Sequence, residues 1–196
     1  FHDVREYDPL SFVREILIGE CHTAACICGF NFRFGYRGAG TSSDLSRLLA
    51  EANVPLTVID PVTHEDTPVS STRIREAVAE GDMESAAALL GRPFSVCLPV
   101  RHGKKLGRTI GIPTANLMLP KELVVPKFGV YVCRACIDGV SYPAVANVGT
   151  RPTVNGIGIT VEPWILDFSG NLYGREIQLE FHQFLRPGKH FIRCAI

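Results

Sequence analysis

The stretch Gly129-Val-Tyr-Val-Cys-Arg-Ala-Cys-Ile-Asp-Gly-Val-Ser-Tyr-Pro-Ala-Val-Ala-Asn-Val148 decides the fold of the second half of this 196-residue chain. Its valine- and tyrosine-rich first part predicts a strand over residues 129–137. Asp138-Gly139 then predicts a tight hairpin turn, after which the strand returns as far as Val148. Two more strands are expected over residues 160–167 and 175–184. Because no helical pattern lies between these closely spaced strands, they predict a closed antiparallel barrel.

The first ninety residues have a different sequence pattern, in which helical and strand segments alternate. Two short apolar runs, at residues 24–28 and 55–59, read as buried parallel strands, and residues 9–18 have helical spacing. This alternation predicts a doubly wound α/β sheet. The expected helix N-caps are Ser43 or Asp44, Ser71 and Asp82, with helix ends at Ala52, Gly81 and Gly91.

After Gly91-Arg-Pro93 the alternation of helix and strand patterns gives way to short β-rich segments. We therefore expect one domain over residues 1–91 and a second over residues 92–196. Hydrophobic residues make up 46% of the chain and charged residues 20%, which is ordinary for a soluble globular protein. The formal net charge is zero, so no global field attracts nucleic acid or a membrane, and any anion site must be local. No apolar run approaches the roughly 20 residues that span a bilayer. The seven irregularly spaced cysteines are expected to be reduced thiols, which favours a cytoplasmic protein.

One short stretch combines glycines with cations. Residues 103–116 read Gly-Lys-Lys-Leu-Gly-Arg-Thr-Ile-Gly-Ile-Pro-Thr-Ala-Asn, and no Asp or Glu occurs between Ser85 and Lys121. Glycines let the backbone approach a ligand closely, and lysine and arginine attract phosphate oxygens. The stretch lacks the Walker pattern, and its alternative interpretation is a surface hairpin with solubilising lysines. The candidate phosphate-binding residues are Gly103, Lys104, Gly107, Arg108 and Gly111.

Thr114 and Asn116 end this stretch and are candidate magnesium ligands, because hydroxyl and amide oxygens are hard donors. Glu162 is a carboxylate within an apolar strand and is the candidate general base. Taken alone, Glu162 would more ordinarily be an outward-facing residue on a solvated sheet face. Phosphoryl transfer to an alcohol, however, needs positioning, Mg²⁺, cations and a carboxylate that accepts the hydroxyl proton. The combination predicts a kinase that acts on a small hydroxylated molecule.

Other polar clusters flank these residues. Gly149-Thr-Arg-Pro-Thr153 presents Arg151 and two hydroxyls, and Asp167-Phe168 precedes Asn171-Leu-Tyr-Gly174. In the first half, the segment from Gly29 to Gly40 is rich in glycine, arginine and aromatic residues. Val69-Ser-Ser-Thr-Arg-Ile-Arg75 opens a helix with hydroxyls and arginines, which favours anion binding, although plain N-capping would also explain them.

In combination, these segments resemble the bacterial bifunctional riboflavin kinase/FAD synthetase family. The resemblance rests on the 103–116 stretch, Gly149-Thr-Arg-Pro-Thr153, Val161-Glu162, Leu166-Asp-Phe168 and Leu172-Tyr-Gly174, and it covers nearly the whole chain. It implies a six-stranded Greek-key barrel that phosphorylates riboflavin to FMN with ATP and Mg²⁺. It also implies that the first domain is part of an α/β nucleotidylyltransferase that converts FMN to FAD.

The resemblance also assigns roles to residues. Thr114 and Asn116 would hold the metal and the ATP phosphates, Glu162 would be the base for the ribityl 5′-hydroxyl, and residues 103–111 would cover the nucleotide. The flavin side would include Arg151, Thr153, Asp167 and Arg186. The nucleotide-binding residues of the first domain would be Asn31, Arg33, Gly35, Ser71, Thr72 and Arg73.

Two features depart from the family pattern. The His-x-Gly-His motif of the adenylyltransferase is not found, and the closing Ile-Arg-Cys-Ala-Ile does not resemble the helix that usually ends the family. We therefore expect a fragment that does not make FAD and that has kinase activity, weakened if the helix supports the flavin site. Two alternatives stay open, namely a non-catalytic flavin or nucleotide binder and a barrel that binds single-stranded nucleic acid. Zero net charge and one tight cationic cluster disfavour the latter, so small molecules are the expected partners.

Overall fold

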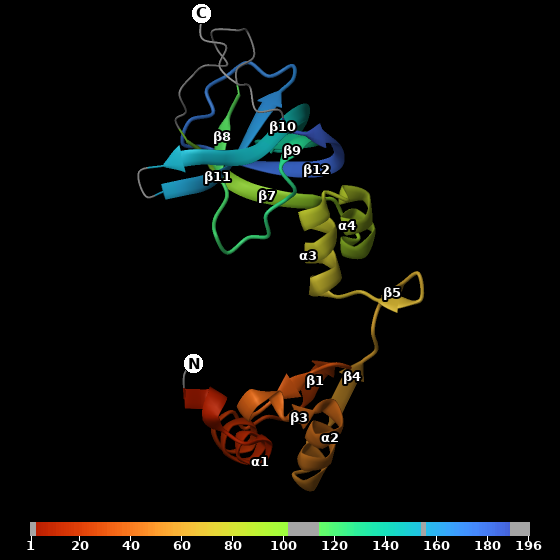
Figure 1. Ribbon diagram of the computed structural model, residues 1–196. Coiled ribbons are helices and arrows are strands. Elements are labelled where there is room, and N and C mark those ends of the chain that lie inside the picture. The colour runs from red at the N-terminus through yellow and green to blue at the C-terminus, as the bar shows by residue number, and fades with distance from the viewer. Residues whose placement is uncertain (1–2, 102–113, 154–155, 189–196) are drawn as a thin grey trace, which may run out of the picture. The chain divides into compact units, whose positions relative to one another are not determined.

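The computed structural model describes residues 3–101, 114–153 and 156–188 (Figure 1). The chain divides into two compact units, Phe1–Pro68 and Val69–Ile196, which are described separately.

Unit 1 is a small α/β unit. Its sheet is a parallel pair formed by β1 (Cys26–Gly29) and β4 (Leu56–Ile59). Leu45, Leu48 and Leu49 of α2 (Ser42–Glu51) are buried against Val13 and Phe34. The other elements are η1 (Asp3–Glu6), α1 (Pro9–Ser11), the π-helix η2 (Phe12–Glu20), β2 (Arg33–Phe34), η3 (Tyr36–Gly38), β3 (Gly40–Thr41), β5 (Thr63–His64) and β6 (Thr67–Pro68). The parallel pair with its packed helices confirms the predicted α/β class of this part.

Unit 2 is a barrel with two helices. The helices are α3 (Ser71–Glu80) and α4 (Met83–Leu90), and the strands are β7 (Phe94–Arg101), β8 (Asn116–Met118), β9 (Gly129–Ile137), β10 (Val140–Thr153), β11 (Gly156–Ile165) and β12 (Glu176–Pro187). The six strands close in the order β10-β11-β8-β7-β12-β9, and every neighbouring pair is antiparallel. Since β8 lies beside β11 while β9, β10 and β11 follow one another, the topology is of Greek-key type. The predicted six-stranded antiparallel barrel is therefore confirmed.

The strand pattern of the sequence matches the barrel closely. β9 has the predicted bounds, and Asp138 and Gly139 both have positive φ (52° and 81°), as a tight hairpin turn requires. β11 begins and ends earlier than expected, and β12 extends beyond the expected strand to Pro187. Burial of the Cys133 side chain inside the barrel raises the pKa of its thiol to about 12, so this cysteine stays protonated and unreactive.

Two helix caps differ from the sequence prediction by one to three residues. Thr41, rather than Ser43 or Asp44, caps α2, and Asp44 completes a capping box with it. Ser70, rather than Ser71, caps α3 by accepting a hydrogen bond from the Arg73 N–H at 3.3 Å. The reason is that an N-cap needs extended backbone, which Thr41 and Ser70 have, whereas the predicted residues already lie within the helices. The predicted cap of α4, Asp82, is confirmed.

The two helices share the barrel's hydrophobic core. Val78 of α3 and Met83 and Ala86 of α4 are almost fully buried in the same cluster as the inward-facing strand residues. The compact unit therefore begins at Val69, earlier than the boundary at 91/92 that the change of texture suggested. The physical reason is that α4 packs against β12 and β7 of the barrel, and α3 packs against α4. The assignment of residues 1–91 to one functional domain stays a prediction.

Candidate active site

Glu162 lies on the outer face of the barrel. Its neighbour Val161 is buried inside and is paired with Leu117 across β11 and β8. The same antiparallel register sets Glu162 opposite Asn116, and both side chains are half-buried. Because directly opposite residues project to the same side of a sheet, the predicted base and one predicted metal ligand share one surface.

Arg151 joins this surface from β10. Its Nη1 donates a hydrogen bond of 2.8 Å to the Asn116 Oδ1, across a sequence separation of 35 residues. The bond shows that the amide oxygen of Asn116 points outward, toward the cationic group of Arg151. The structure brings Arg151 to the candidate metal ligand, and its predicted place on the flavin side stays a prediction.

Thr114 lies two residues before Asn116 and forms an isolated antiparallel bridge with Trp164 of β11. Alternate residues of an extended segment share a face, so Thr114 and Asn116 are suited to act together. A hydroxyl and an amide oxygen on one face, with a carboxylate opposite, form a set of hard oxygen donors. The chemistry of these residues therefore fits Mg²⁺, and the roles of Thr114 and Asn116 as its ligands stay a prediction.

The register extends this surface by two residues that the sequence prediction missed. Asn147 of β10 is paired directly with Glu162, and Arg101 of β7 is paired with Asn116. Both side chains are exposed. Asn147 lies within the apolar run Ala144–Val148, where a single polar residue was the available signal. The sequence around Arg101 gave no sign of a functional role, because the residues that lie beside Arg101 in space depend on how the barrel closes.

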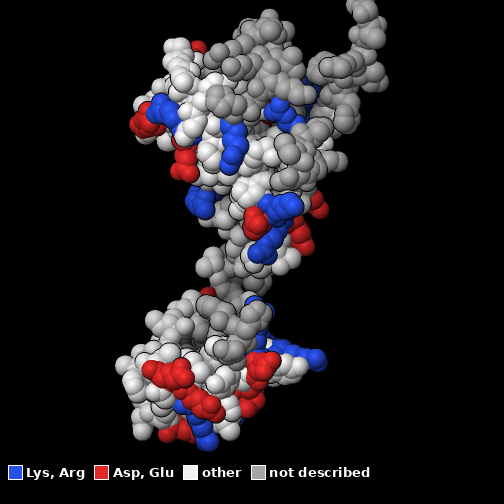
Figure 2. All heavy atoms as spheres, turned by 90° about the vertical axis from the view of Figure 1, so that its left-hand side faces the viewer, with Lys and Arg blue, Asp and Glu red and all other residues white. Residues whose placement is uncertain are grey.

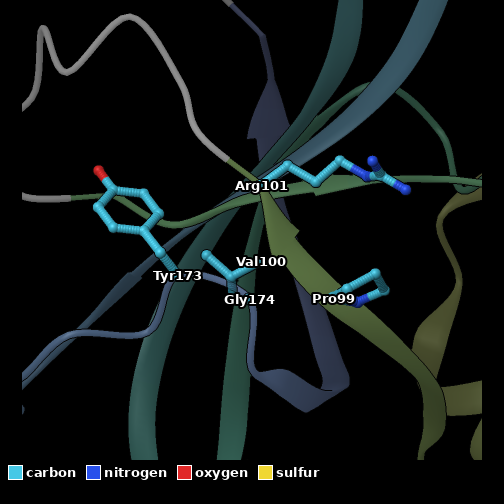
Figure 3. Close-up of a pocket in the computed structure, with 5 residues that line it drawn as sticks. All are labelled: Pro99, Val100, Arg101, Tyr173 and Gly174. Atoms are coloured by element: carbon cyan, nitrogen blue, oxygen red, sulfur yellow. The ribbon is translucent and has the colours of Figure 1, made fainter.

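A hollow of about 560 Å³ lies at the end of β7 (Figure 3). The Arg101 and Tyr173 side chains point to opposite sides of it, and Pro99, Val100 and Gly174 complete the lining. Two backbone hydrogen bonds hold its walls together, from the Gly174 N–H to the Val100 carbonyl (3.0 Å) and from the Val100 N–H to the Arg175 carbonyl (2.9 Å). The hollow thus combines apolar surface with one aromatic ring and borders the strand pair that carries Asn116.

For several predicted site residues, the described part of the structure shows no contact with this surface. Asp167 is exposed in a positive-φ turn (φ 56°), and Arg186 is exposed and donates to the Pro187 carbonyl at 3.3 Å. Thr153 ends β10, but its side chain is outside the described part. The phosphate-loop candidates lie outside the described residues, namely Gly103, Lys104, Gly107, Arg108 and Gly111.

The six candidates for nucleotide binding in the first half fall in different units. In unit 1, the exposed Arg33 is paired with Thr41, and Gly35 has φ 73° with Pro9 so close that no Cβ would fit. Asn31 lies just before this hairpin, next to Gly29. In unit 2, Ser71, Thr72 and Arg73 form the first turn of α3. Their role in binding a nucleotide stays a prediction.

Figure 2 shows one face of the molecule coloured by charge. In this view basic and acidic side chains are interspersed on the described surface of the barrel unit, with no broad area of one sign. Among the described residues, no helix has the length and apolarity needed to cross a membrane.

Two family models match this chain. One, described as riboflavin kinase, matches residues 90–195, and the other, described as FAD synthetase, matches residues 2–73. The first covers the barrel with its candidate site, and the second covers unit 1 and the start of α3.

Curated proteins named bifunctional riboflavin kinase/FMN adenylyltransferase are similar over almost the whole chain. The protein from Pseudomonas fluorescens is 39% identical over 96% of this chain, and that from Listeria monocytogenes is 35% identical over 95%. The Escherichia coli K12 protein is 36% identical over 92%. The chain spans about three fifths of the length of these relatives (60%, 59% and 58%, respectively).

One solved structure has nearly the same fold. It is a crystal structure described as a macrolide-efflux protein from Streptococcus pneumoniae, with a TM-score of 0.83 and 31% sequence identity. The match covers 98% of this chain and 62% of that chain.

Proposed function

The chain belongs to the riboflavin kinase family, and on that premise we propose that it transfers the γ-phosphoryl group of ATP to the 5′-hydroxyl of riboflavin. The products would be FMN and ADP. The observation that carries the proposal is the shared outer face of Asn116, Glu162 and Arg151, with Arg151 hydrogen-bonded to Asn116 at 2.8 Å. An oxygen ligand, a carboxylate and a cation on one surface are the protein groups that phosphoryl transfer to an alcohol needs.

Glu162 has the role of general base in this proposal. Its carboxylate accepts the proton of the substrate hydroxyl while the hydroxyl oxygen forms a bond to the γ-phosphorus and the bond from phosphorus to the bridging oxygen of ADP breaks. Among the described residues, no side chain forms a hydrogen bond or ion pair with the Glu162 carboxylate. The carboxylate is therefore available to a substrate hydroxyl.

Thr114 and Asn116 would hold Mg²⁺, which when bound neutralises charge on the phosphate oxygens. The Arg151 guanidinium donates its hydrogen bond to this Asn116 oxygen. With Mg²⁺ at that oxygen, like charges would repel the guanidinium, and Arg151 would pair with a phosphate oxygen. Arg151 would thus exchange the Asn116 oxygen for a phosphate oxygen.

The hollow at the end of β7 supports a substrate with a planar ring. Val100 and Pro99 offer apolar surface and Tyr173 offers an aromatic ring, while few polar groups intrude. ATP and riboflavin both carry planar rings attached to a polar chain. We place the activity in the cytoplasm, with these small molecules as its partners.

The test is to incubate the chain with riboflavin, ATP and Mg²⁺ and to separate the flavins by chromatography. We expect FMN to accumulate in proportion to enzyme and to require both ATP and the metal. Tight riboflavin or ADP binding without FMN would instead support the non-catalytic binder. Retention of single-stranded nucleic acid without FMN would support the nucleic-acid alternative.

A further inference from the structure

Asn147 lies beside the candidate base, Glu162, on the neighbouring strand of the barrel. The ladder between β10 and β11 pairs Asn147 directly with Glu162, and the neighbouring Ala146 and Val148 are buried inside the barrel. Directly opposite residues of an antiparallel pair have Cβ atoms about 4.5–5.5 Å apart. The carboxamide of Asn147 is therefore within reach of the carboxylate, or of a group that the carboxylate holds.

The Asn147 carboxamide is also open to its surroundings. A Cβ placed on Gly149 would lie 3.6 Å from the Asn147 Nδ2, and one placed on Gly188 would lie 3.7 Å from Oδ1. Glycine at both positions leaves space beside the amide. Within the described ranges, the Asn147 side chain has no hydrogen-bond partner. Its two N–H donors are thus uncommitted, next to a carboxylate whose oxygens are uncommitted too.

Asn116, which flanks Glu162 on its other side in the register, differs from Asn147 in its hydrogen bonding. Asn116 presents its amide oxygen outward, because that oxygen accepts the hydrogen bond from Arg151. The Asn116 carboxamide is thus fixed by its bond to Arg151, whereas that of Asn147 is not. Of the two residues that flank Glu162 in the register, Asn147 is therefore the one whose carboxamide is free to turn toward the base.

We propose that Asn147 is a positioning residue for Glu162, a role that rests on the kinase function proposed above. In the loaded site, one Nδ2–H donates to one oxygen of the Glu162 carboxylate, and the other oxygen is thereby turned toward the substrate hydroxyl. Asn147 itself neither gains nor loses a proton.

Two variants at this position separate donation from packing. Asn147→Ala removes the amide, and Asn147→Asp keeps its shape but replaces the N–H donor by a second carboxylate. We expect kcat to fall roughly 10- to 100-fold in N147A, the value of one hydrogen bond to a charged group, with little change in KM for either substrate. N147D should lose at least as much. S141D is the matched control, because it adds the same charge on the same face of β10, roughly 20 Å along the strand.

A double-mutant cycle with E162Q tests whether Asn147 acts through Glu162. In the E162Q background, N147A should cause no further loss of kcat, since the base it orients is absent. The inference would be overturned if the losses of kcat in N147A and E162Q multiplied in the double variant, or if N147D kept the wild-type kcat. Lack of FMN from the wild-type chain would remove the kinase proposal first, and this inference with it.

Discussion

At the scale of single residues, the candidate site consists of polar side chains on a surface whose inner side is fully apolar. Asn116, Glu162 and Asn147 lie in one row across β8, β11 and β10, while Leu117, Val161 and Val148 beside them are buried inside. A rigid barrel wall therefore fixes the backbone of each functional residue. Single substitutions in the row should change chemistry without unfolding the protein.

Glu162→Gln is the first such substitution. It removes the base but keeps size and polarity, so we expect kcat to fall by about 10²–10⁴-fold while ADP binding and the unfolding transition stay the same. FMN formation, calorimetric titration with ADP and thermal unfolding measure these quantities. Glu176→Gln, at an exposed position of β12, is the control and should keep full activity. Near-normal turnover in E162Q would exclude Glu162 as the base.

Asn116→Ala and Arg151→Ala remove the same hydrogen bond from its two ends. Only N116A also removes the expected metal-binding oxygen. We therefore expect N116A to raise the Mg²⁺ concentration for half-maximal activity by roughly tenfold or more, whereas R151A leaves it unchanged or lowers it. Direct Mn²⁺ binding to the two variants gives a readout that is independent of turnover. Equal shifts in both variants would mean that the hydrogen bond, rather than the oxygen, matters.

At the scale of elements, close approach between strands decides which residues the barrel tolerates. Gly129 begins β9 where β12 passes very near, so that a Cβ at this position would lie 2.5 Å from both the Arg186 carbonyl oxygen and the Phe184 Cε2. Gly139, in the hairpin turn, has positive φ but nothing within 4 Å of such a Cβ. Gly129, with φ 157°, is thus needed for both a steric and a conformational reason, whereas Gly139 is needed for its backbone conformation alone.

Gly129→Ala should lower the free energy of unfolding by about 1–3 kcal/mol, because the added methyl group forces β9 and β12 apart. Gly139→Asn should be nearly neutral, since asparagine tolerates the left-handed conformation and meets no neighbour there. Urea unfolding followed by the fluorescence of Trp164, the single tryptophan of the chain, measures both variants. A G129A protein as stable as the wild type would contradict the close approach of these strands.

At the scale of the whole molecule, the chain folds as two units, and α3 and α4 belong to the unit that contains the barrel. Met83 is 1% exposed and lies in the barrel's core cluster, whereas Leu49 is buried in the separate core of unit 1. Trp164 of β11 reports only on unit 2. The two cores can therefore be perturbed and observed independently.

Met83→Ala should destabilise the Trp164-detected transition by about 2–5 kcal/mol, because it leaves a cavity between the helices and the barrel. Leu49→Ala should leave that transition unchanged while it lowers the stability of unit 1, measured by circular dichroism. If the helices folded independently of the barrel, M83A would not move the tryptophan transition. That outcome would favour a folding boundary near residue 91.

The sequence by itself determined what depends on neighbouring residues. The bounds of β9, the Asp138-Gly139 turn, the Asp82 cap and the change from α/β to β texture all follow from side-chain period, turn chemistry and capping, which act over a few residues. The residue types of the site were also recognisable, because hard oxygen donors and a carboxylate are chemically distinctive.

Only the tertiary structure decided which of these residues meet. The contact between Arg151 and Asn116, the place of Asn147 opposite Glu162 and the burial of α4 against the barrel all join segments far apart in sequence. The physical reason is that strand register is set jointly by the closure of six strands around one apolar core. A shift of one strand by one residue would move each of its side chains to the other face of the sheet. The sequence of a single segment does not determine this register.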